Sequence, residues 1–269
     1  MLPYYPLPGF QGDTASAFSA CMPLFSKRCA LRSEPFPDAQ PLPCNPMPNY
    51  RVKFETVTVA GLDYLIRSLA NLQQYADPQG EADRAGISPA SWSLFGHIWP
   101  SARVLALAMH SFDLAGKRIL EIGAGLGLAS LVIHRRAGDI TVSDWHPLSQ
   151  AFLRENALLN KMEPLKYQTG NWAISNPELG QFDLIIGSDV LYERQQPDQL
   201  AAFIASHAAP DAQIVIVDPD RGNRVGFCRE MTRLGYDCSS RIAERVIENG
   251  ERYKGRFLSF SQTSARALA

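Results

Sequence analysis

A strand that runs directly into three alternating glycines most constrains the fold of this chain. Residues 119–127 read Ile-Leu-Glu-Ile-Gly-Ala-Gly-Leu-Gly, and an apolar helical segment follows from Leu128 to about Arg136. Glycine has no Cβ, so its backbone can turn tightly and approach a bound group. The first turn of the helix offers unpaired N–H groups to a polar or anionic group. The segment therefore predicts an α/β fold with a nucleotide-type binding turn.

The spacing of the glycines distinguishes between classes of nucleotide site. Folds that bind a dinucleotide pyrophosphate use the pattern G-x-G-x-x-G. Here Gly123, Gly125 and Gly127 form G-x-G-x-G, and Leu128 occupies the position that a third dinucleotide glycine would fill. Together with Glu121, the pattern resembles motif I of class I S-adenosylmethionine (SAM) methyltransferases.

Two features outside the turn bear on this resemblance. Asp144 ends a short strand about 20 residues after the first glycine, where an acid can accept hydrogen bonds from both ribose hydroxyls; a solvated acid at a strand end is the alternative. Two β-patterned runs, 245–248 and 253–260, flank Asn249-Gly250, a strong hairpin signal. A final antiparallel hairpin on a parallel sheet resembles the seven-stranded methyltransferase core. An NAD-dependent enzyme is therefore the least favoured class.

Composition excludes several other classes. With 269 residues, of which 46% are hydrophobic, the chain can bury a full core. A net charge of −1 argues against a general nucleic-acid binder, which usually carries a basic excess. We expect no membrane span and no signal peptide, because the required apolar stretches are missing. Five cysteines without a C-x-x-C pair indicate reduced thiols in a cytoplasmic protein.

The chain divides into three regions. Residues 1–49 hold ten of the nineteen prolines, so this extension is extended or disordered unless it docks on the core. We expect residues 50–93 to form an N-terminal hairpin or cap region, and the resemblance implies that residues 94–269 form the SAM-dependent methyltransferase core.

Strand and helix patterns alternate along the core, which predicts an α/β, doubly wound, mostly parallel sheet. The resemblance implies seven strands with a C-terminal antiparallel hairpin, a Rossmann-like methyltransferase fold. The expected elements are strands at 51–59 and 62–69 (the latter a helix start as the alternative), a polar loop at 76–90, a helix at 100–110, a strand at 118–122, a helix at 127–136, a strand at 140–143, a helix at 148–160, strands at 165–168 and 182–187, a helix at 197–208, a strand at 213–217, a helix at 225–234, and the closing hairpin.

Four segments narrow the resemblance to the protein lysine methyltransferase group of the seven-β-strand enzymes, over residues 94–260. Gly96–Ala102 resembles a Gly-x-x-Trp segment whose tryptophan lines the SAM pocket, and Gly170–Trp172 resembles the adenine-side segment. The glycine turn with Asp144 is the third match. Ser188–Tyr192, Ser-Asp-Val-Leu-Tyr, matches the D-x-x-Y motif, which is the most specific signature of the group.

The resemblance implies SAM as cofactor, with S-adenosylhomocysteine (SAH) as its product. An aromatic residue such as Trp172 suits stacking on the flat adenine, and a SAM sulfonium is attracted to aromatic faces and carboxylates; for Trp99 and Trp172, a core position is the alternative. The residues that the resemblance assigns to cofactor binding are Trp99, Glu121, Gly123, Ala124, Gly125, Gly127, Asp144, Asn171, Trp172 and Ser188.

Asp189 and Tyr192 are the predicted catalytic residues. Asp189 follows a buried strand, at the edge where open α/β sheets bind ligands. A free lysine has a pKa near 10.4, so forming the neutral amine at pH 7 costs roughly 4–5 kcal/mol. We expect Asp189 and Tyr192 to accept hydrogen bonds from the amine, to aim it at the methyl group and to offset part of that cost.

The segment Val217–Arg221 resembles the Asp-Pro-Gly-Arg segment of the electron-transfer-flavoprotein β-subunit lysine methyltransferase branch, except that Asp220 replaces the glycine. Asp218 and Arg221 either contact substrate or form a loop ion pair. His97 and His146 flank the cofactor motifs, but their spacing does not make a metal set, so we expect no metal.

The leading hypothesis is a SAM-dependent methyltransferase that methylates a lysine of a protein acceptor. One alternative is a small-molecule N- or O-methyltransferase with the N-terminal 90 residues as a lid. Another is a SAM-binding, non-catalytic interaction protein whose proline-rich arm contacts a partner. We expect neither nucleic acid nor membrane as partner. The acceptor and the oligomeric state have no signal in the sequence.

Overall fold

A seven-stranded sheet organises the chain, which the computed structural model describes at residues 49–192, 196–220, 222–243, 245–246 and 252–262. Its strands are β3 Arg118–Ile122, β4 Asp139–Asp144, β5 Lys166–Thr169, β6 Phe182–Ser188, β7 Ala208–Asp218, β8 Tyr236–Ile242 and β11 Arg256–Gln262. The strand order is β5-β4-β3-β6-β7-β11-β8; β11 runs antiparallel to both of its neighbours, and all other neighbouring pairs are parallel. This confirms the predicted doubly wound, mostly parallel sheet.

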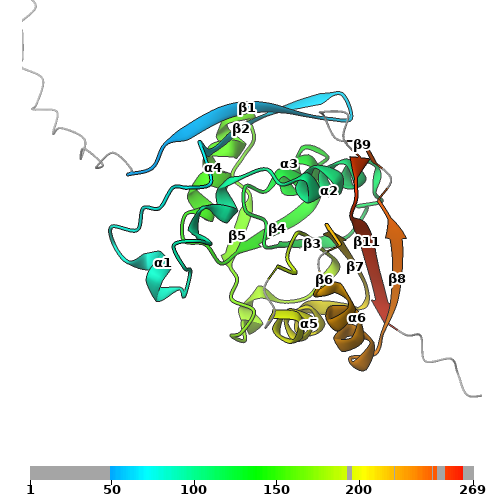
Figure 1. Ribbon diagram of the computed structural model, residues 1–269. Coiled ribbons are helices and arrows are strands. Elements are labelled where there is room, and N and C mark those ends of the chain that lie inside the picture. The colour runs from blue at the N-terminus through cyan, green and yellow to red at the C-terminus, as the bar shows by residue number, and fades with distance from the viewer. Residues whose placement is uncertain (1–48, 193–195, 221, 244, 247–251, 263–269) are drawn as a thin grey trace, which may run out of the picture. The chain divides into compact units, whose positions relative to one another are not determined.

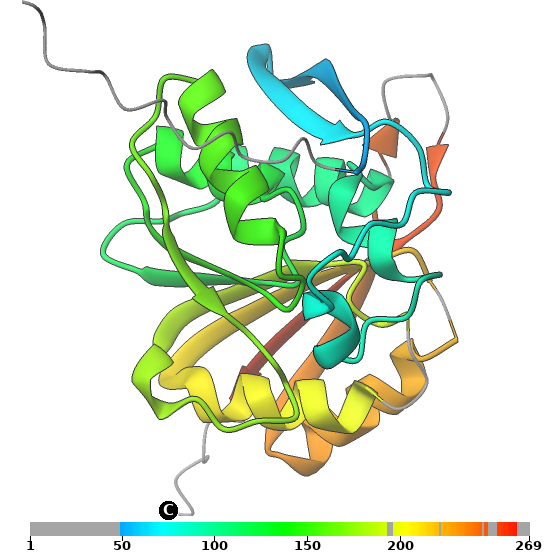
Figure 2. The same cartoon turned by 90° about the vertical axis from the view of Figure 1, so that its left-hand side faces the viewer.

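Helices cover both faces of the sheet. They are α2 Pro100–Ser111, α3 Leu128–Arg135, α4 Ser149–Leu159, α5 Gln196–His207 and α6 Arg224–Arg233. The first three lie on one face and the last two on the other (Figures 1 and 2). Alternate residues of a strand point to opposite faces, so Ile119 packs into the core beneath α2–α4, whereas Leu120 and Ile122 pack into the core beneath α5 and α6.

The predicted N-terminal hairpin is confirmed. Strands β1 (Val52–Val59) and β2 (Leu62–Leu69) pair antiparallel along their whole length. Ala60 and Gly61 connect them with φ angles of 50° and 80°. Two consecutive positive φ angles are typical of the type I′ turn, whose twist matches that of the flanking strands.

Helix α4 closes the free edge of β2 with two side-chain amides. Asn160 accepts a hydrogen bond from the backbone N–H of Leu65 (2.9 Å) and donates one to its carbonyl (2.8 Å). Asn156 accepts a hydrogen bond from the backbone N–H of Arg67 (2.8 Å). Residues four apart lie on one face of a helix, so the two asparagines act together as a substitute for a third strand.

The expected polar loop at 76–90 contains a short helix that was not predicted, α1 (Glu81–Arg84). The Asp77 carboxylate accepts hydrogen bonds from the backbone N–H groups of Ala82 (3.1 Å) and Asp83 (2.9 Å). Because a helix terminus leaves such N–H groups unpaired, the carboxylate stabilises a single turn in a segment with little apolar periodicity. A 3-10 helix, η1 (Trp92–Gly96), follows it.

The C-terminal antiparallel pair exists, but the prediction of its first strand was wrong. The expected strands were 245–248 and 253–260, whereas the sheet partner of β11 is β8, which begins at Tyr236. Tyr236 is the single buried residue of β8. The apolar alternation that indicates a strand is therefore absent from this polar edge strand.

The predicted hairpin strands form a small extension of that pair. Strands β9 (Arg245–Val246) and β10 (Arg252–Tyr253) pair with each other in a separate two-stranded ladder. The backbone N–H of Ala243 donates a hydrogen bond to the carbonyl of Gly255 (2.9 Å), between this ladder and the β8–β11 pair. The predicted Asn249-Gly250 tip lies outside the described residues.

Candidate functional site: a glycine-walled cavity and its acidic edge

A cavity of about 410 Å³ opens at the carboxyl ends of the parallel strands. Its walls come from residues 123–128 after β3, 144–146 after β4, 170–172 after β5 and 188–190 after β6, together with parts of 85–99. Open α/β sheets bind ligands at this edge, and ligand pockets typically enclose about 300–1,000 Å³. The motifs that are scattered along the sequence therefore meet in one ligand-sized pocket.

The glycine turn has no room for side chains. Gly123, Gly125 and Gly127 have φ angles of 57°, 55° and 70°, which L-residues with a Cβ rarely adopt. A Cβ would stand 2.7 Å from Val190 at Gly123, 2.8 Å from the carbonyl oxygen of Phe95 at Gly125, and 2.5 Å from Leu153 at Gly127. Each glycine is thus required by its backbone conformation and by its surroundings.

Asp144 fixes the position of this turn. One carboxylate oxygen accepts a hydrogen bond from the backbone N–H of Gly125 (2.7 Å), and the other accepts one from that of His146 (2.8 Å). Burial raises the pKa of Asp144, and these backbone hydrogen bonds oppose the rise. The acid predicted to face a ribose also lines the cavity, so it joins the turn to the pocket wall.

Glu121 is placed differently from the other motif residues. It does not line the cavity but lies buried against α3, where Oε2 accepts hydrogen bonds from the backbone N–H (2.8 Å) and the hydroxyl of Ser130. Burial raises its pKa to about 7. Strand alternation turns this side chain toward the helix, so Glu121 supports the turn from behind the cavity wall and does not line the cavity itself.

The remaining predicted cofactor residues line the cavity: Trp99, Gly123, Ala124, Gly125, Gly127, Asp144, Asn171, Trp172 and Ser188. Trp99 stands before α2, and its indole Nε1–H donates a hydrogen bond to the carbonyl of Leu94 (2.9 Å). The Trp172 ring lies 3.5 Å from the position of a Cβ on Gly123. Both tryptophans therefore present ring surface to the pocket.

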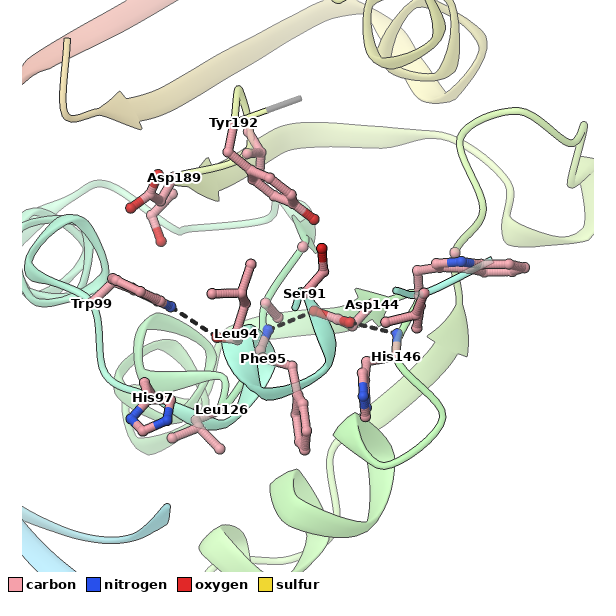
Figure 3. A pocket seen from close by; sticks show the side chains of 18 of the residues that line it. Ser91, Leu94, Phe95, His97, Trp99, Leu126, Asp144, His146, Asp189 and Tyr192 are labelled. Atoms are coloured by element: carbon pink, nitrogen blue, oxygen red, sulfur yellow. Dashed lines mark hydrogen bonds between the residues drawn. The ribbon is translucent and has the colours of Figure 1, made fainter. Parts of the chain in front are cut away.

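Sequence reasoning missed the wall formed by residues 85–95. Trp145 anchors it, because its Nε1–H donates a hydrogen bond to the carbonyl of Ala85 (2.6 Å). Ser91, Leu94 and Phe95 also line the cavity (Figure 3). The segment showed no motif of its own, and its closeness to the Gly96–Trp99 segment was the one signal that could have placed it.

His146 is a buried wall residue that stays neutral. Its ring stacks on Phe95 with centroids 3.7 Å apart, and its Nδ1 accepts a hydrogen bond from the backbone N–H of Leu148 (3.2 Å). Burial lowers the pKa of His146 to about 3, against a small opposing effect of Asp77. Both His146 and His97 line the cavity, as expected of rim or loop residues.

Asp189 and Tyr192 lie together on one side of the pocket, across from Trp99 and Asp144 (Figure 3). Asp189 has a φ angle of 56°, and its backbone N–H donates a hydrogen bond to the carbonyl of Val217 on β7 (2.9 Å). A non-glycine residue in this region is strained, and such strain gathers at functional sites. Tyr192 is 43% exposed at the mouth of the pocket.

Asp218 and Asp220 of the 217–221 segment lie in different surroundings. Asp218 is fully buried, does not line the cavity, and accepts a hydrogen bond from the backbone N–H of Asp220 (2.8 Å). Asp220 itself forms ion pairs with Arg224 (2.8 Å) and Arg256 (3.2 Å). Arg221 lies outside the described residues.

Across the part of the chain that the structure describes, no three His, Cys, Asp or Glu side chains are grouped so as to hold a metal ion. None of the described helices is long and apolar enough to span a membrane.

Comparison with known proteins places these features in a family. The family model described as Lysine methyltransferase matches residues 89–230, which include most of the cavity walls. The fold is also similar to a crystallised protein from Streptococcus mutans named as a SAM-dependent methyltransferase, with a TM-score of 0.53, 12% identity, and coverage of 77% of this chain and 55% of that one.

Sequence relatives are protein methyltransferases. The chain is 28% identical over 127 residues to Protein N-lysine methyltransferase METTL21A of Xenopus tropicalis (45% of this chain, 58% of that protein). It is 27% identical over 143 residues to the electron transfer flavoprotein beta subunit lysine methyltransferase of Mus musculus (52% and 55%). Histone-arginine methyltransferase METTL23 of Xenopus laevis is 33% identical over 104 residues (36% and 44%). The chain thus spans about half the length of these relatives.

Proposed function

Since the chain belongs to the lysine methyltransferase family, we propose that it transfers a methyl group from SAM to the side-chain amine of a lysine in a protein acceptor. One observation carries this proposal. A glycine-walled pocket with Asp144 on one side has Asp189 and Tyr192 on the other (Figure 3). The pocket therefore offers a nucleoside site and an acceptor edge within one cavity.

The described residues fit SAM. The positive-φ glycines let the backbone approach a ligand, and a Cβ at Gly123 or Gly125 would meet a neighbour within 3 Å. Trp172 offers a ring face for adenine, with the Asn171 amide beside it, and Asp144 keeps lone pairs that can accept from ribose hydroxyls. SAM, when bound, supplies the activated methyl group.

The acceptor side provides hydrogen-bond acceptors in a partly enclosed place. A lysine arrives as an ammonium, and it must lose a proton before its nitrogen can attack the methyl carbon. Asp189 and the Tyr192 hydroxyl at the pocket mouth can accept hydrogen bonds from the amine and orient its lone pair. In-line transfer depends strongly on such orientation. Asp189 and Tyr192 thus position the amine, and their hydrogen bonds replace those that the amine loses when it leaves water.

The acceptor class follows the names of the relatives, two of which are protein lysine methyltransferases and one a histone-arginine methyltransferase. A protein acceptor also fits the exposed position of Tyr192 at the pocket mouth. The net charge of −1 provides no basic excess for nucleic acid. Five cysteines without a C-x-x-C pair support a reducing compartment such as the cytoplasm.

The test is methyl transfer from labelled SAM into a cell lysate. We expect label in the protein fraction, and acid hydrolysis should recover it as methyl-lysine. Asp189→Asn should bind SAM as the parent does but lose methyl transfer by about 100-fold or more, because positioned acid–base groups contribute about that much. Asp211→Asn, the same change at an exposed site on β7, should keep full activity.

Three results would contradict the proposal. Label in the small-molecule fraction would indicate a metabolite acceptor, and label in methylarginine would indicate a different side chain. SAM binding without any transfer would indicate an interaction protein. Full transfer by the Asp189→Asn protein would remove the assigned role of Asp189 alone.

A further inference from the structure

We propose that Cys228 and Cys238 form an oxidisable pair, a modification site at which hydrogen peroxide converts two thiols into a disulfide that joins helix α6 to the edge strand β8. The two sulfur atoms lie 2.9 Å apart, with the Cys238 thiol directed at Cys228 Sγ. Both residues are free cysteines. A disulfide bond is about 2.05 Å long, so the sulfurs need to approach by only about 0.9 Å.

The fold brings the two cysteines together from different elements. Cys238 lies directly opposite Phe260 of β11, and opposite residues of an antiparallel pair share one face of the sheet. Phe260 packs edge-to-face on Phe227 of α6 with centroids 5.3 Å apart. Cys238 therefore points to the face that α6 covers, where Cys228 is the residue next to Phe227.

The surroundings give the two thiols different roles. Cys238 is exposed and Cys228 is half-buried, so a dissolved oxidant reaches Cys238 first. Burial, together with the neighbouring Cys238 sulfur, raises the pKa of the Cys228 thiol to about 12. Because the thiolate is the reactive form, Cys238 is the initial nucleophile and Cys228 is the resolving thiol.

The chemistry balances in two steps. The Cys238 thiolate attacks the O–O bond of hydrogen peroxide, which gives a sulfenic acid on Cys238 and releases hydroxide. The Cys228 sulfur then attacks the Cys238 sulfur, an S–S bond forms, the sulfenic hydroxyl leaves, and the thiol proton of Cys228 completes a water molecule. The two thiols lose two electrons, and the peroxide is reduced to two molecules of water.

The bond would constrain a helix that touches the acceptor edge. The Asn223 side-chain amide, at the start of α6, donates a hydrogen bond to the carbonyl of Leu191 (2.9 Å), beside Tyr192. Neither cysteine lines the cavity. We therefore expect oxidation to stabilise α6 against unfolding and to leave the ligand-binding turn unchanged. This inference does not depend on the proposed methyl transfer.

Peptide mapping of the full-length protein tests the proposal. The protein is treated with graded hydrogen peroxide, its remaining thiols are alkylated, and it is digested with trypsin. Cleavage at arginines separates 225–229, which holds Cys228, from 234–241, which holds Cys238. We expect these two peptides to appear covalently joined, in an amount that rises with peroxide and disappears after thiol reduction.

Matched variants decide the assignment. Cys228→Ser and Cys238→Ser should each abolish the joined peptides, whereas Cys29→Ser should retain them. The oxidised parent should unfold at a higher temperature than its reduced form, and oxidised Cys238→Ser should show no such rise. Recovery of Cys238 only as sulfinic acid, its linkage to Cys21, Cys29 or Cys44, or no reaction of either thiol would overturn the proposal.

Discussion

At the scale of single residues, the glycine turn leaves the least freedom. Gly125 has a φ angle of 55°, its backbone N–H donates a hydrogen bond to the Asp144 carboxylate, and the carbonyl of Phe95 lies next to the position that a Cβ would occupy. Its conformation, its hydrogen bond and its surroundings all require the same residue. The pattern in the sequence reflects these local requirements, which is why the turn could be predicted.

Replacing Gly125 tests this requirement. Gly125→Ala should weaken SAM binding by about tenfold or more, because the free protein relaxes out of the left-handed conformation and must return to it when SAM binds. That conformation costs an L-residue about 1–2 kcal/mol before the contact with Phe95 is counted, and 1.4 kcal/mol equals tenfold. Titration calorimetry measures the affinity. The control is Gly226→Ala on α6, where a Cβ meets nothing within 4 Å. Unchanged SAM binding by the Gly125→Ala protein would contradict the close-approach argument.

Glu121 makes stability depend on pH. Burial raises its pKa from 4.5 to about 7 in the folded chain, so the folded state holds a proton that the unfolded state has already lost. The stabilising contribution is complete below pH 4.5 and is lost as the pH rises to about 7. Glu121→Gln removes this dependence.

We therefore expect the unfolding free energy of the Glu121→Gln protein to rise relative to the parent by about 3 kcal/mol between pH 4.5 and pH 7.5. Urea unfolding at several pH values measures the difference, and all other titrating groups are common to both proteins. A difference that does not change with pH would show that Glu121 ionises normally in the folded state.

At the scale of elements, side chains complete the edges that strands leave open. The amides of Asn156 in α4 and of Asn160 at its C-terminal end hold the free edge of β2, and Asp77 holds the first turn of α1. The asparagine contacts join residues about 90 positions apart in the sequence, and the Asp77 contact is a local polar cap, so apolar periodicity predicts neither of them. Strand β8 also could not be predicted from periodicity, because nearly all its residues are exposed, although its pairing with β11 completes the sheet.

The hydrogen bond from β2 to Asn156 should make a measurable contribution to the free energy of unfolding. Asn156 is fully buried, and Asn156→Ala would leave the backbone N–H of Arg67 without its acceptor. Stability should fall by about 1–3 kcal/mol, the cost of a buried unsatisfied donor. Chemical denaturation measures the loss. Leu158→Ala, at a position on the same helix that is 57% exposed, should change stability by less than about 0.5 kcal/mol, and an equal loss in both variants would refute the explanation.

At the scale of the whole molecule, the cavity joins the carboxyl edge of the sheet to the segment 85–99. A ligand can contact both parts only when the chain is folded, so it binds the folded state and not the unfolded state. SAM at about 100 times its dissociation constant should therefore raise the unfolding free energy by about 2.7 kcal/mol. Thermal unfolding with and without ligand measures this, and NAD at the same concentration is the control. Equal stabilisation by NAD would favour the dinucleotide reading.

Local chemistry by itself determined much of this protein. The order of the core strands and helices, the glycine turn and Asp144 at the end of β4 follow from backbone conformation and from apolar periodicity within a few residues, and the D-x-x-Y segment after β6 is identified by its resemblance to a family motif. Tertiary structure alone decided that Glu121 turns away from the cavity, that residues 85–95 form its wall, that β8 pairs with β11, and that Cys228 meets Cys238. Each of these depends on which distant surfaces pack together, and no short stretch of sequence carries that information.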